Sequence, residues 1–390
     1  MLEYRNSMNV VGLFAGIGGL ELGLHKAGHR TSLLCEIEPS ACAVLKARFT
    51  ETEITNDVRT LRKLPGNTEL LAGGFPCQDI SQAGKTKGLD GKNSSLVNEV
   101  FRLLRTNDVP HVLLENVSFI IALGKGAVMR HITKELEELG YRWAYRVIDT
   151  RSFGLPQRRQ RLFLVASRTM EPFDVLMRGN FPDQEPQNWR DHSCGFYWTE
   201  GIRGLGWAVG AVPTLKGGST IGIPSSPAIW FQNGRIATPD IRDAERLQGF
   251  LPDWTTPAEQ VGRGSFRWKL VGNAVSVPVA KWIGEGLAGH GGPLEFLVHN
   301  FDTEKTWPTA AFGGPRSRPM AAEVSLFPQC DTVPDIAEFL DYPVKPLSLK
   351  ATEGFVGRLR SGSLRYPAEF LNALETHIDQ LRGSARLAVA

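Results

Sequence analysis

The sequence contains few cysteines and no cysteine spacing that is typical of a metal site. Its five cysteines are scattered and odd in number: Cys35, Cys42, Cys77, Cys194 and Cys330. Because none of them forms a CxxC pair, we predict no metal. A disulfide framework is typical of small secreted chains with paired cysteines, so we expect a reducing compartment.

Long apolar runs are also lacking. Residues 1–7 contain no apolar signal core, and the later apolar runs are short. A membrane-spanning helix needs roughly 20 apolar residues, so this class of protein is excluded. We expect a cytoplasmic monomer that does not bind membranes.

An excess of positive charge is the third absent feature. The chain has 44 Lys and Arg residues against 41 Asp and Glu, which gives a net charge of +3. Bulk charge therefore does not indicate nucleic-acid binding, and any phosphate-binding surface must be local. The densest basic runs lie in Arg142–Arg151 and Arg158–Arg161, and such runs usually form a solvated face.

Short apolar runs do alternate with helical patterns from residue 9 to about residue 167. This rhythm predicts a mostly parallel α/β sheet. The expected strands are Val10–Phe14, Thr31–Cys35, Leu70–Ala72, Val112–Leu114 and Arg161–Ala166. From about residue 170 to 237, Gly, Pro, Trp and Asn follow no clean period, which indicates a second, smaller and irregular domain. A last helix is expected near Ala368–Leu381.

A glycine-rich turn, Phe14–Gly19, follows the first expected strand and opens a helix. Its glycines permit a tight turn and the close approach of a ligand to the backbone. Glu36, just after the second strand, could accept hydrogen bonds from a ribose, and Asp57 could meet an adenine amine. Together they favour an adenosine ligand, either a nicotinamide cofactor or S-adenosylmethionine.

Cys77 lies in Gly74–Gln78, directly after the strand at Leu70–Ala72. This places a thiol at the carboxyl edge of the sheet, where open α/β proteins bind ligands. Cys77 is therefore the best candidate for a nucleophile. The small and basic residues of the following segment, among them Lys85, are typical of a loop that closes over a phosphate backbone.

Glu115 ends the strand at Val112–Leu114, where a buried carboxyl could donate a proton. Arg159 and Arg161 precede or open the next strand, and period-two alternation predicts that both lie on one face. Two inward guanidinium groups beside a thiol and a carboxyl indicate a polar substrate that carries a carbonyl group.

The residues named in the three preceding paragraphs, in the order in which they follow one another along the chain, resemble the DNA cytosine-C5 methyltransferase family. The resemblance is to the prokaryotic type with a single recognition region. The resemblance covers roughly residues 9 to 285 and implies a Rossmann-like, S-adenosylmethionine-dependent large domain with a smaller, β-rich target-recognition domain. It implies that these residues surround S-adenosylmethionine: Phe14, Gly16, Ile17, Gly18, Gly19, Glu36, Ile37, Asp57, Gly74, Asn273 and Val275.

The resemblance also implies the catalytic roles. Cys77 would attack C6 of a cytosine flipped out of double-stranded DNA, while Glu115 acts at N3 and Arg159 and Arg161 orient the base. Residues expected to contact DNA are Lys85, Arg203, Thr214 and Gly217. A cognate restriction endonuclease is a possible partner within a restriction-modification system.

With these roles, the chain is expected to divide into four segments. Residues 1–170 form the catalytic and cofactor-binding domain, 171–240 the target-recognition domain, 241–290 a bracing helix and the return of the chain, and 291–390 an extension of unknown role. Three alternatives stay open: an RNA cytosine-C5 methyltransferase of the same fold, a non-catalytic DNA-binding relative, and a nicotinamide oxidoreductase.

Overall fold

The computed structural model describes residues 7–76, 96–182, 188–218, 226–292 and 294–387. The chain forms two compact units. The large unit comprises Met1–Phe153, Gln160–Asp183 and Ala274–Cys330, and the small unit comprises Gly154–Arg159, Gln184–Asn273 and Asp331–Ala390. The expected extension, 291–390, is therefore divided between the two units.

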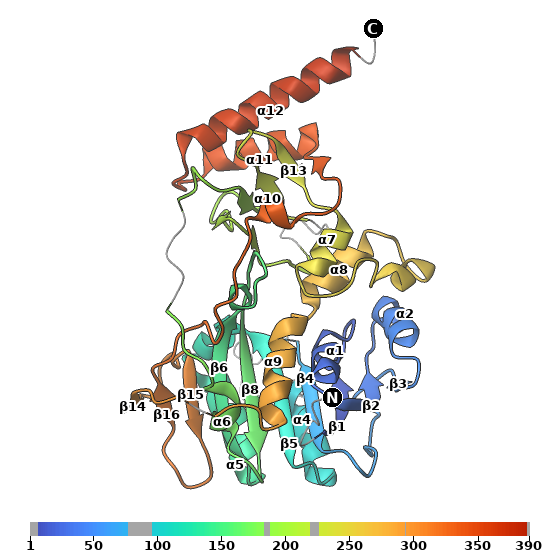
Figure 1. Ribbon diagram of the computed structural model, residues 1–390, viewed down its shortest axis with the longest axis vertical. Coiled ribbons are helices and arrows are strands. Elements are labelled where there is room, and N and C mark those ends of the chain that lie inside the picture. The colour runs from blue at the N-terminus through green and yellow to red at the C-terminus, as the bar shows by residue number, and fades with distance from the viewer. Residues whose placement is uncertain (1–6, 77–95, 183–187, 219–225, 293, 388–390) are drawn as a thin grey trace. The chain divides into compact units, whose positions relative to one another are not determined.

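The large unit is built on a ten-stranded sheet with helices on both faces (Figure 1). The first five strands in the order β3-β2-β1-β4-β5 are parallel to one another. Their bounds are β1 Asn9–Leu13, β2 Arg30–Cys35, β3 Glu53–Thr55, β4 Leu70–Gly74 and β5 His111–Val117. Four of these strands were predicted from the sequence, as was β8 (Gln160–Ser167), and all five are confirmed.

The other half of this sheet is antiparallel, so the prediction of a mostly parallel sheet is wrong there. β8 pairs antiparallel with β5 and with β6 (Arg142–Asp149). Three short strands complete that edge through antiparallel pairs: β15 Ala310–Gly313, β16 Met320–Ala322 and β14 Val298–Asn300. They come from the segment after residue 290, whose sequence gave no strand signal.

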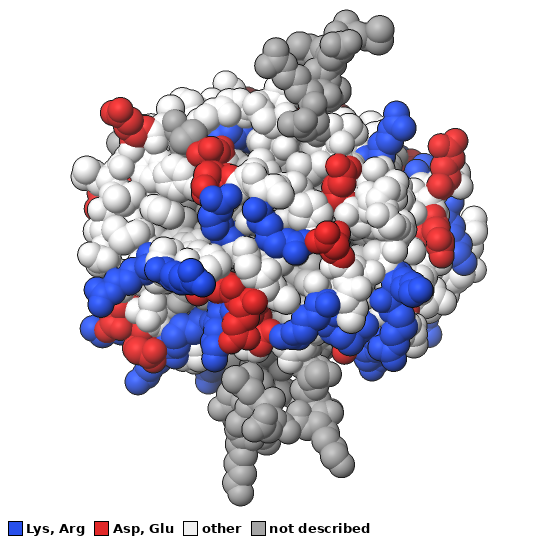
Figure 2. All heavy atoms as spheres, turned by 90° about the horizontal axis from the view of Figure 1, so that it is seen from below, with Lys and Arg blue, Asp and Glu red and all other residues white. Residues whose placement is uncertain are grey.

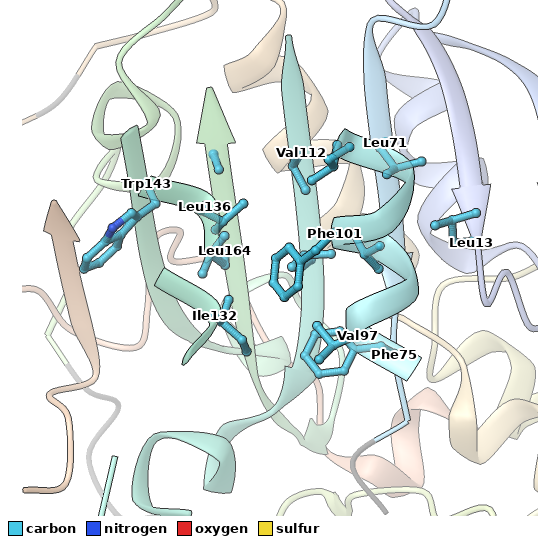
Figure 3. Packing of buried hydrophobic residues seen from close by; sticks show 14 of the residues in the cluster. Leu13, Leu71, Phe75, Val97, Phe101, Val112, Ile132, Leu136, Trp143 and Leu164 are labelled. Carbon is cyan, nitrogen blue, oxygen red and sulfur yellow. The ribbon is translucent and has the colours of Figure 1, made fainter. Parts of the chain in front are cut away.

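Alternate residues of the central strands enter two separate cores. On one face, Val11, Leu71, Val112 and Leu164 pack with two helices (Figure 3). These helices are α4 (Leu96–Thr106) and α5 (Ala127–Glu138), which contribute Phe101, Leu136 and their neighbours. On the other face, the intervening residues pack with α1 (Gly19–Lys26), α6 (Pro172–Leu176) and α9 (Val277–Leu287). The sheet is therefore buried on both sides, and functional groups lie at the ends of its strands.

The chain returns to the large unit through α9, which packs closely on α1. A Cβ atom at Gly23 would lie 2.4 Å from Ala280 Cβ, and one at Gly284 would lie 2.7 Å from Ala27 Cβ. The buried His29 reinforces this contact, because Nε2 donates to the Gly284 carbonyl at 2.8 Å while Nδ1 accepts from the Met8 amide at 3.1 Å. The small residues and this histidine hold a helix 250 residues away in sequence against the first one.

A buried arginine lies inside the basic run at Arg142–Arg151. Arg146 is on β6 and is fully buried. Its guanidinium donates to the main-chain carbonyls of Leu176, Gly179 and Ser325, and burial lowers its pKa to about 10. The interpretation of this run as a solvated face is therefore wrong at Arg146, which ties β6 to two loops.

Basic and acidic side chains alternate on the face of the molecule that Figure 2 shows. Ion pairs of the large unit include Arg105 with Glu135, Lys134 with Glu138, and Arg168 with Asp108. Such mixing matches the near balance of charges in the sequence. Within the described residues, no helix is both long and apolar enough to cross a membrane.

The small unit has a five-stranded sheet in the order β10-β9-β12-β13-β17. The strands are short: β9 Cys194–Phe196, β10 Ala208–Val209, β12 Ala228–Trp230, β13 Ile236–Thr238 and β17 Lys345–Pro346. A further pair joins β7 (Gln157–Arg158) to β11 (Val212–Pro213). The helices are α7 Ile241–Arg246, α8 Phe266–Asn273, α10 Ile336–Phe339, α11 Leu349–Ser361 and α12 Ala368–Leu387. The predicted final helix is confirmed as α12.

The last two helices supply much of the core of the small unit. Phe370 of α12 is fully buried, and its ring lies 5.0 Å from those of Phe196 and Trp207 and 5.5 Å from that of Trp230. Phe355 of α11 stacks on Phe196 at 5.1 Å. Segments about 170 residues apart thus share one aromatic core, and the C-terminal segment is an integral part of the small unit.

Glu21 lies in the first turn of α1 and is fully buried. A Cβ atom at Gly12 would lie 2.2 Å from Glu21 Oε1, so the glycine makes room for the carboxyl. Neither carboxyl oxygen has a hydrogen-bond partner among the described residues. Burial raises the pKa of Glu21 to about 8, with a further contribution from the nearby Glu36. The group is therefore neutral at pH 7.

Replacing Glu21 by Gln should change how stability depends on pH. Because the folded pKa of about 8 exceeds the ordinary value of 4.5, the folded state holds a proton that the unfolded state releases. The wild-type free energy of unfolding should therefore fall by on the order of a few kcal/mol as the pH rises from the unfolded pKa to the folded pKa of Glu21. Urea unfolding of both proteins from pH 5 to 9 measures the difference, and parallel curves for wild type and Glu21→Gln would contradict it.

Phe370→Ala should destabilise the small unit by about 3–5 kcal/mol, because it empties the centre of the aromatic core. Tryptophan fluorescence during urea unfolding reports the change, since Trp207 and Trp230 contact the lost ring. Leu251→Ala is the control, because Leu251 is 72% exposed. Equal midpoints for the two variants would show that α12 is not part of this core.

Candidate active site

The glycine-rich turn between β1 and α1 has an open backbone. Phe14, Gly16 and Gly18 have φ angles of 54°, 56° and 81°. Positive φ is adopted easily by glycine and rarely by phenylalanine, so the turn is tightly constrained. In the part of the chain that the structure describes, no atom lies within 4 Å of the place where a Cβ atom would stand at Gly16. A ligand can therefore approach this peptide closely.

The Glu36 carboxylate holds the turn in place from the end of β2. Its Oε2 accepts from the Gly16 amide at 2.7 Å, and its Oε1 accepts from the Glu38 amide at 2.8 Å. These bonds use two of about four acceptor positions on a carboxylate. The neighbouring Ile37 is 62% exposed and offers an apolar surface to a nucleobase. The turn, the carboxylate and the apolar side chain fit a nucleoside.

Asp57 follows β3, the next strand along the sheet edge. Arg59 donates two hydrogen bonds to its carboxylate, from Nε to Oδ1 at 3.0 Å and from Nη2 to Oδ2 at 3.0 Å. These bonds lower the pKa of Asp57. Asp57 is therefore ionised, and an adenine amine that met this carboxylate would share it with Arg59.

Glu115 and Arg161 form an ion pair at the carboxyl ends of β4 and β5. The Arg161 Nε lies 3.2 Å from Glu115 Oε1, and the two side chains are only 16% and 10% exposed. β8 runs antiparallel to β5, so its first residues lie beside the last residues of β5. This pairing brings together two of the sequence-predicted catalytic residues.

The end of β4 leaves room for the pair of Glu115 and Arg161. A Cβ atom at Gly74 would lie 2.8 Å from Glu115 Oε2, so the glycine leaves space for the carboxylate. Asn116, next to Glu115, donates from Nδ2 to the Phe75 carbonyl at 2.9 Å. Its Oδ1 accepts from the Val117 amide at 2.9 Å. Asn116 lies within β5, and the sequence alone indicated no role for it in the site.

Cys77 is the third residue after Gly74, the last residue of β4, and it lies outside the described residues, as does Lys85. The described chain reaches Pro76, and Phe75 is buried in the core. Asn116 therefore fixes the peptide that leads directly to the expected nucleophile.

Arg159 belongs to the small unit, whereas Arg161 belongs to the large unit. β8 begins at Gln160, so the prediction that both arginines share one face of a strand is wrong. The buried Arg159 donates from Nη1 to the carbonyls of Leu215 and Gly272, at 3.1 and 3.2 Å. It links two segments of the small unit.

The expected DNA-contacting residues other than Lys85 lie in the small unit. Arg203 is exposed, and Thr214 donates from Oγ1 to the Arg158 carbonyl at 2.7 Å. Gly217 lies against the side chain of Asn273, the last residue of α8. Val275 is part of the large unit and is buried in the core that contains α9.

The sequence was compared with protein families and with known proteins. The family model for the C-5 cytosine-specific DNA methylase matches residues 8–194. The Type II methyltransferase M2.BsuMI of Bacillus subtilis is 47% identical over 382 residues, which cover 94% of this chain and 97% of that protein. This chain belongs to the C-5 cytosine-specific DNA methylases.

Other relatives of this methylase agree. M.NgoBI of Neisseria gonorrhoeae, also a Type II methyltransferase, is 30% identical over 69% of this chain and 89% of its own. The S. pombe Dnmt2 methyltransferase structure has a TM-score of 0.54 at 16% identity and covers 73% of this chain and 98% of its own. That likeness supports the methyltransferase fold.

Two groups of residues in this methylase carried no signal of their own in the sequence. Gln157 accepts from the Leu215 amide at 3.0 Å and donates to the Leu247 carbonyl at 2.8 Å. Lys216 pairs with Glu200 and lies 3.8 Å from the centre of the Tyr197 ring. Both groups hold the segment around residue 215. The role of Gln157 could have been suspected from the sequence, because its amide stands in the same motif as Arg159 and Arg161.

Gly74→Ala should lower kcat for methylation by about 10- to 100-fold, because the added Cβ displaces the Glu115 carboxylate from its place beside Arg161. Steady-state kinetics with varied DNA and varied methyl donor separates kcat from the two KM values. Gly66→Ala is the matched control, since no atom of the described residues lies within 4 Å of a Cβ there. An effect confined to the KM of the methyl donor would contradict a role through Glu115.

Proposed function

We propose that this methylase transfers a methyl group to C5 of one cytosine within a short sequence of double-stranded DNA, with Cys77 as nucleophile. The buried pair of Glu115 and Arg161 carries this proposal. The pair lies beside Gly74, at the end of the strand from which the chain leads to Cys77. A reaction between a thiol and a ring that must be protonated requires an acid near the thiol.

The chain's residues can perform each step on the cytosine. The Cys77 thiolate bonds to C6, and the electrons of the C5–C6 double bond move towards C5 while Glu115 holds and protonates N3. S-adenosylmethionine supplies the methyl group when it is bound. A base then removes the C5 proton, the double bond forms again, Cys77 leaves as the thiolate, and N3 returns its proton to Glu115.

Arg161 orients the Glu115 carboxylate through their ion pair, and its guanidinium is suited to the O2 of the base. Arg159 is proposed for the same task on the strength of the resemblance. Its two bonds to main-chain carbonyls support a second role, as a brace within the small unit.

S-adenosylmethionine is proposed to bind at the turn Phe14–Gly19. The open backbone at Gly16, the Glu36 carboxylate and the exposed Ile37 support this assignment. Glu36 would accept from the ribose hydroxyls, and the resemblance assigns Gly74, Asn273 and Val275 to the same cofactor.

The target cytosine must leave the base stack, because its C6 is hidden within the duplex. The small unit is proposed to read the DNA sequence with Arg203, Thr214 and Gly217. The relatives named Type II methyltransferases support a place in a restriction-modification system, in which a cognate endonuclease would cut the unmethylated site.

An RNA cytosine-C5 methyltransferase remains the second candidate, because it would use the same nucleophile and carboxylate. The high identity to a Type II methyltransferase along nearly the whole chain favours DNA. Methylation of duplex DNA and of transfer RNA, assayed side by side, separates the two.

Plasmid DNA from a methylation-free host that expresses this chain should carry 5-methylcytosine at one short sequence. Bisulfite sequencing detects the modification and reveals the sequence that is read. Cys77→Ala is the control and should leave the plasmid unmodified, because the addition to C6 is lost. Modification by both proteins would exclude Cys77 as the nucleophile, and modification by neither would favour RNA as substrate.

A further inference from the structure

We propose that Gly217, in the segment expected to read DNA, sets the affinity for S-adenosylmethionine by positioning the Asn273 side chain. The inference rests on the proposed function, which assigns Thr214 and Gly217 to DNA and Asn273 to the cofactor. We call residues 214–217 the recognition loop. All the contacts that carry the argument lie within the small unit.

The recognition loop and the end of α8 approach each other without intervening side chains. A Cβ atom at Gly272 would lie 2.2 Å from the Lys216 carbonyl carbon and 2.5 Å from the Gly217 nitrogen. Real Cβ atoms are not found so close to main-chain atoms, so glycine is required at residue 272 for this packing. The backbone of the loop therefore rests directly on the last turn of α8.

Two side chains, Arg159 and Gln157, fix the loop at this distance, and Gln248 holds the end of α8. Arg159 donates from one nitrogen, Nη1, to the carbonyls of both Leu215 and Gly272. Gln157 accepts from the Leu215 amide at 3.0 Å, and Gln248 donates to the Val271 carbonyl at 2.9 Å. Because Arg159 and Gln157 are buried, a movement of the loop would break bonds that water cannot replace.

Gly217 is the place where the loop meets the Asn273 side chain. A Cβ atom there would lie 2.1 Å from Asn273 Oδ1 and 3.0 Å from Nδ2. The backbone at Gly217 is held as described, whereas the amide is the end of a rotatable side chain. A methyl group at residue 217 would therefore turn the Asn273 amide away rather than move the loop.

Gly218 provides a matched comparison. None of the described residues has an atom within 4 Å of a Cβ atom at Gly218, and neither glycine has a positive φ angle. Alanine is thus tolerated by the backbone at both positions, and the two substitutions differ in the contact with Asn273.

The experiment measures the binding of S-adenosylhomocysteine by calorimetry, without DNA. Gly217→Ala should weaken binding by about 5- to 100-fold, and Gly218→Ala should leave the affinity unchanged. In an Asn273→Ala background, Gly217→Ala should change the affinity less than about 2-fold, because the displaced amide is already absent. Thermal unfolding of each protein without ligand shows that the variants are folded.

Three results would overturn the inference. The first is an unchanged affinity in a folded Gly217→Ala protein. The second is a loss of affinity on Gly217→Ala that is equal in the wild-type and the Asn273→Ala background. Both would leave the proposed function intact. Failure of the wild-type protein to bind S-adenosylhomocysteine would remove the cofactor assignment and this inference together.

Discussion

The antiparallel pairing of β8 with β5 is the constraint on which the site depends. In its register, Val117 faces Arg161 and Glu115 faces Phe163, so the arginine and the carboxylate lie two residues apart on the same face of the sheet. A slip by one residue would turn Arg161 to the opposite face. The cores on both sides of the sheet exclude such a slip, because it would exchange the apolar residues that enter each core.

Much of the large unit could be predicted because its signals are local. The central strands are continuous apolar runs, and the turn Phe14–Gly19 directly precedes an amphipathic helix. β6 could not be recognised as a buried strand, because Arg142 and Arg146 interrupt its apolar run. The bonds that satisfy Arg146 come from carbonyls more than 25 residues away in sequence, and such partners become visible in the folded chain.

The positions of Arg159 and Arg161 show a second limit of sequence reasoning. Period-two alternation holds within one strand, but the chain passes from the small unit to the large unit between Arg159 and Gln160. The two arginines therefore have different surroundings in spite of their spacing. The placement of Glu115, Arg161 and Glu36 at strand ends followed from the sequence. The roles of Gln157 and Asn116 did not, because each depends on a main-chain group of another element.

The small unit is assembled from three separate stretches of chain, and its aromatic core joins Phe196 to Phe370. This order has a consequence for synthesis on the ribosome. The parallel half of the large sheet is complete once β5 has emerged, and it can fold while translation continues. The small unit lacks α12 until residues 368–387 have been made. A nascent chain therefore acquires its glycine-rich turn long before it can complete the core of the small unit.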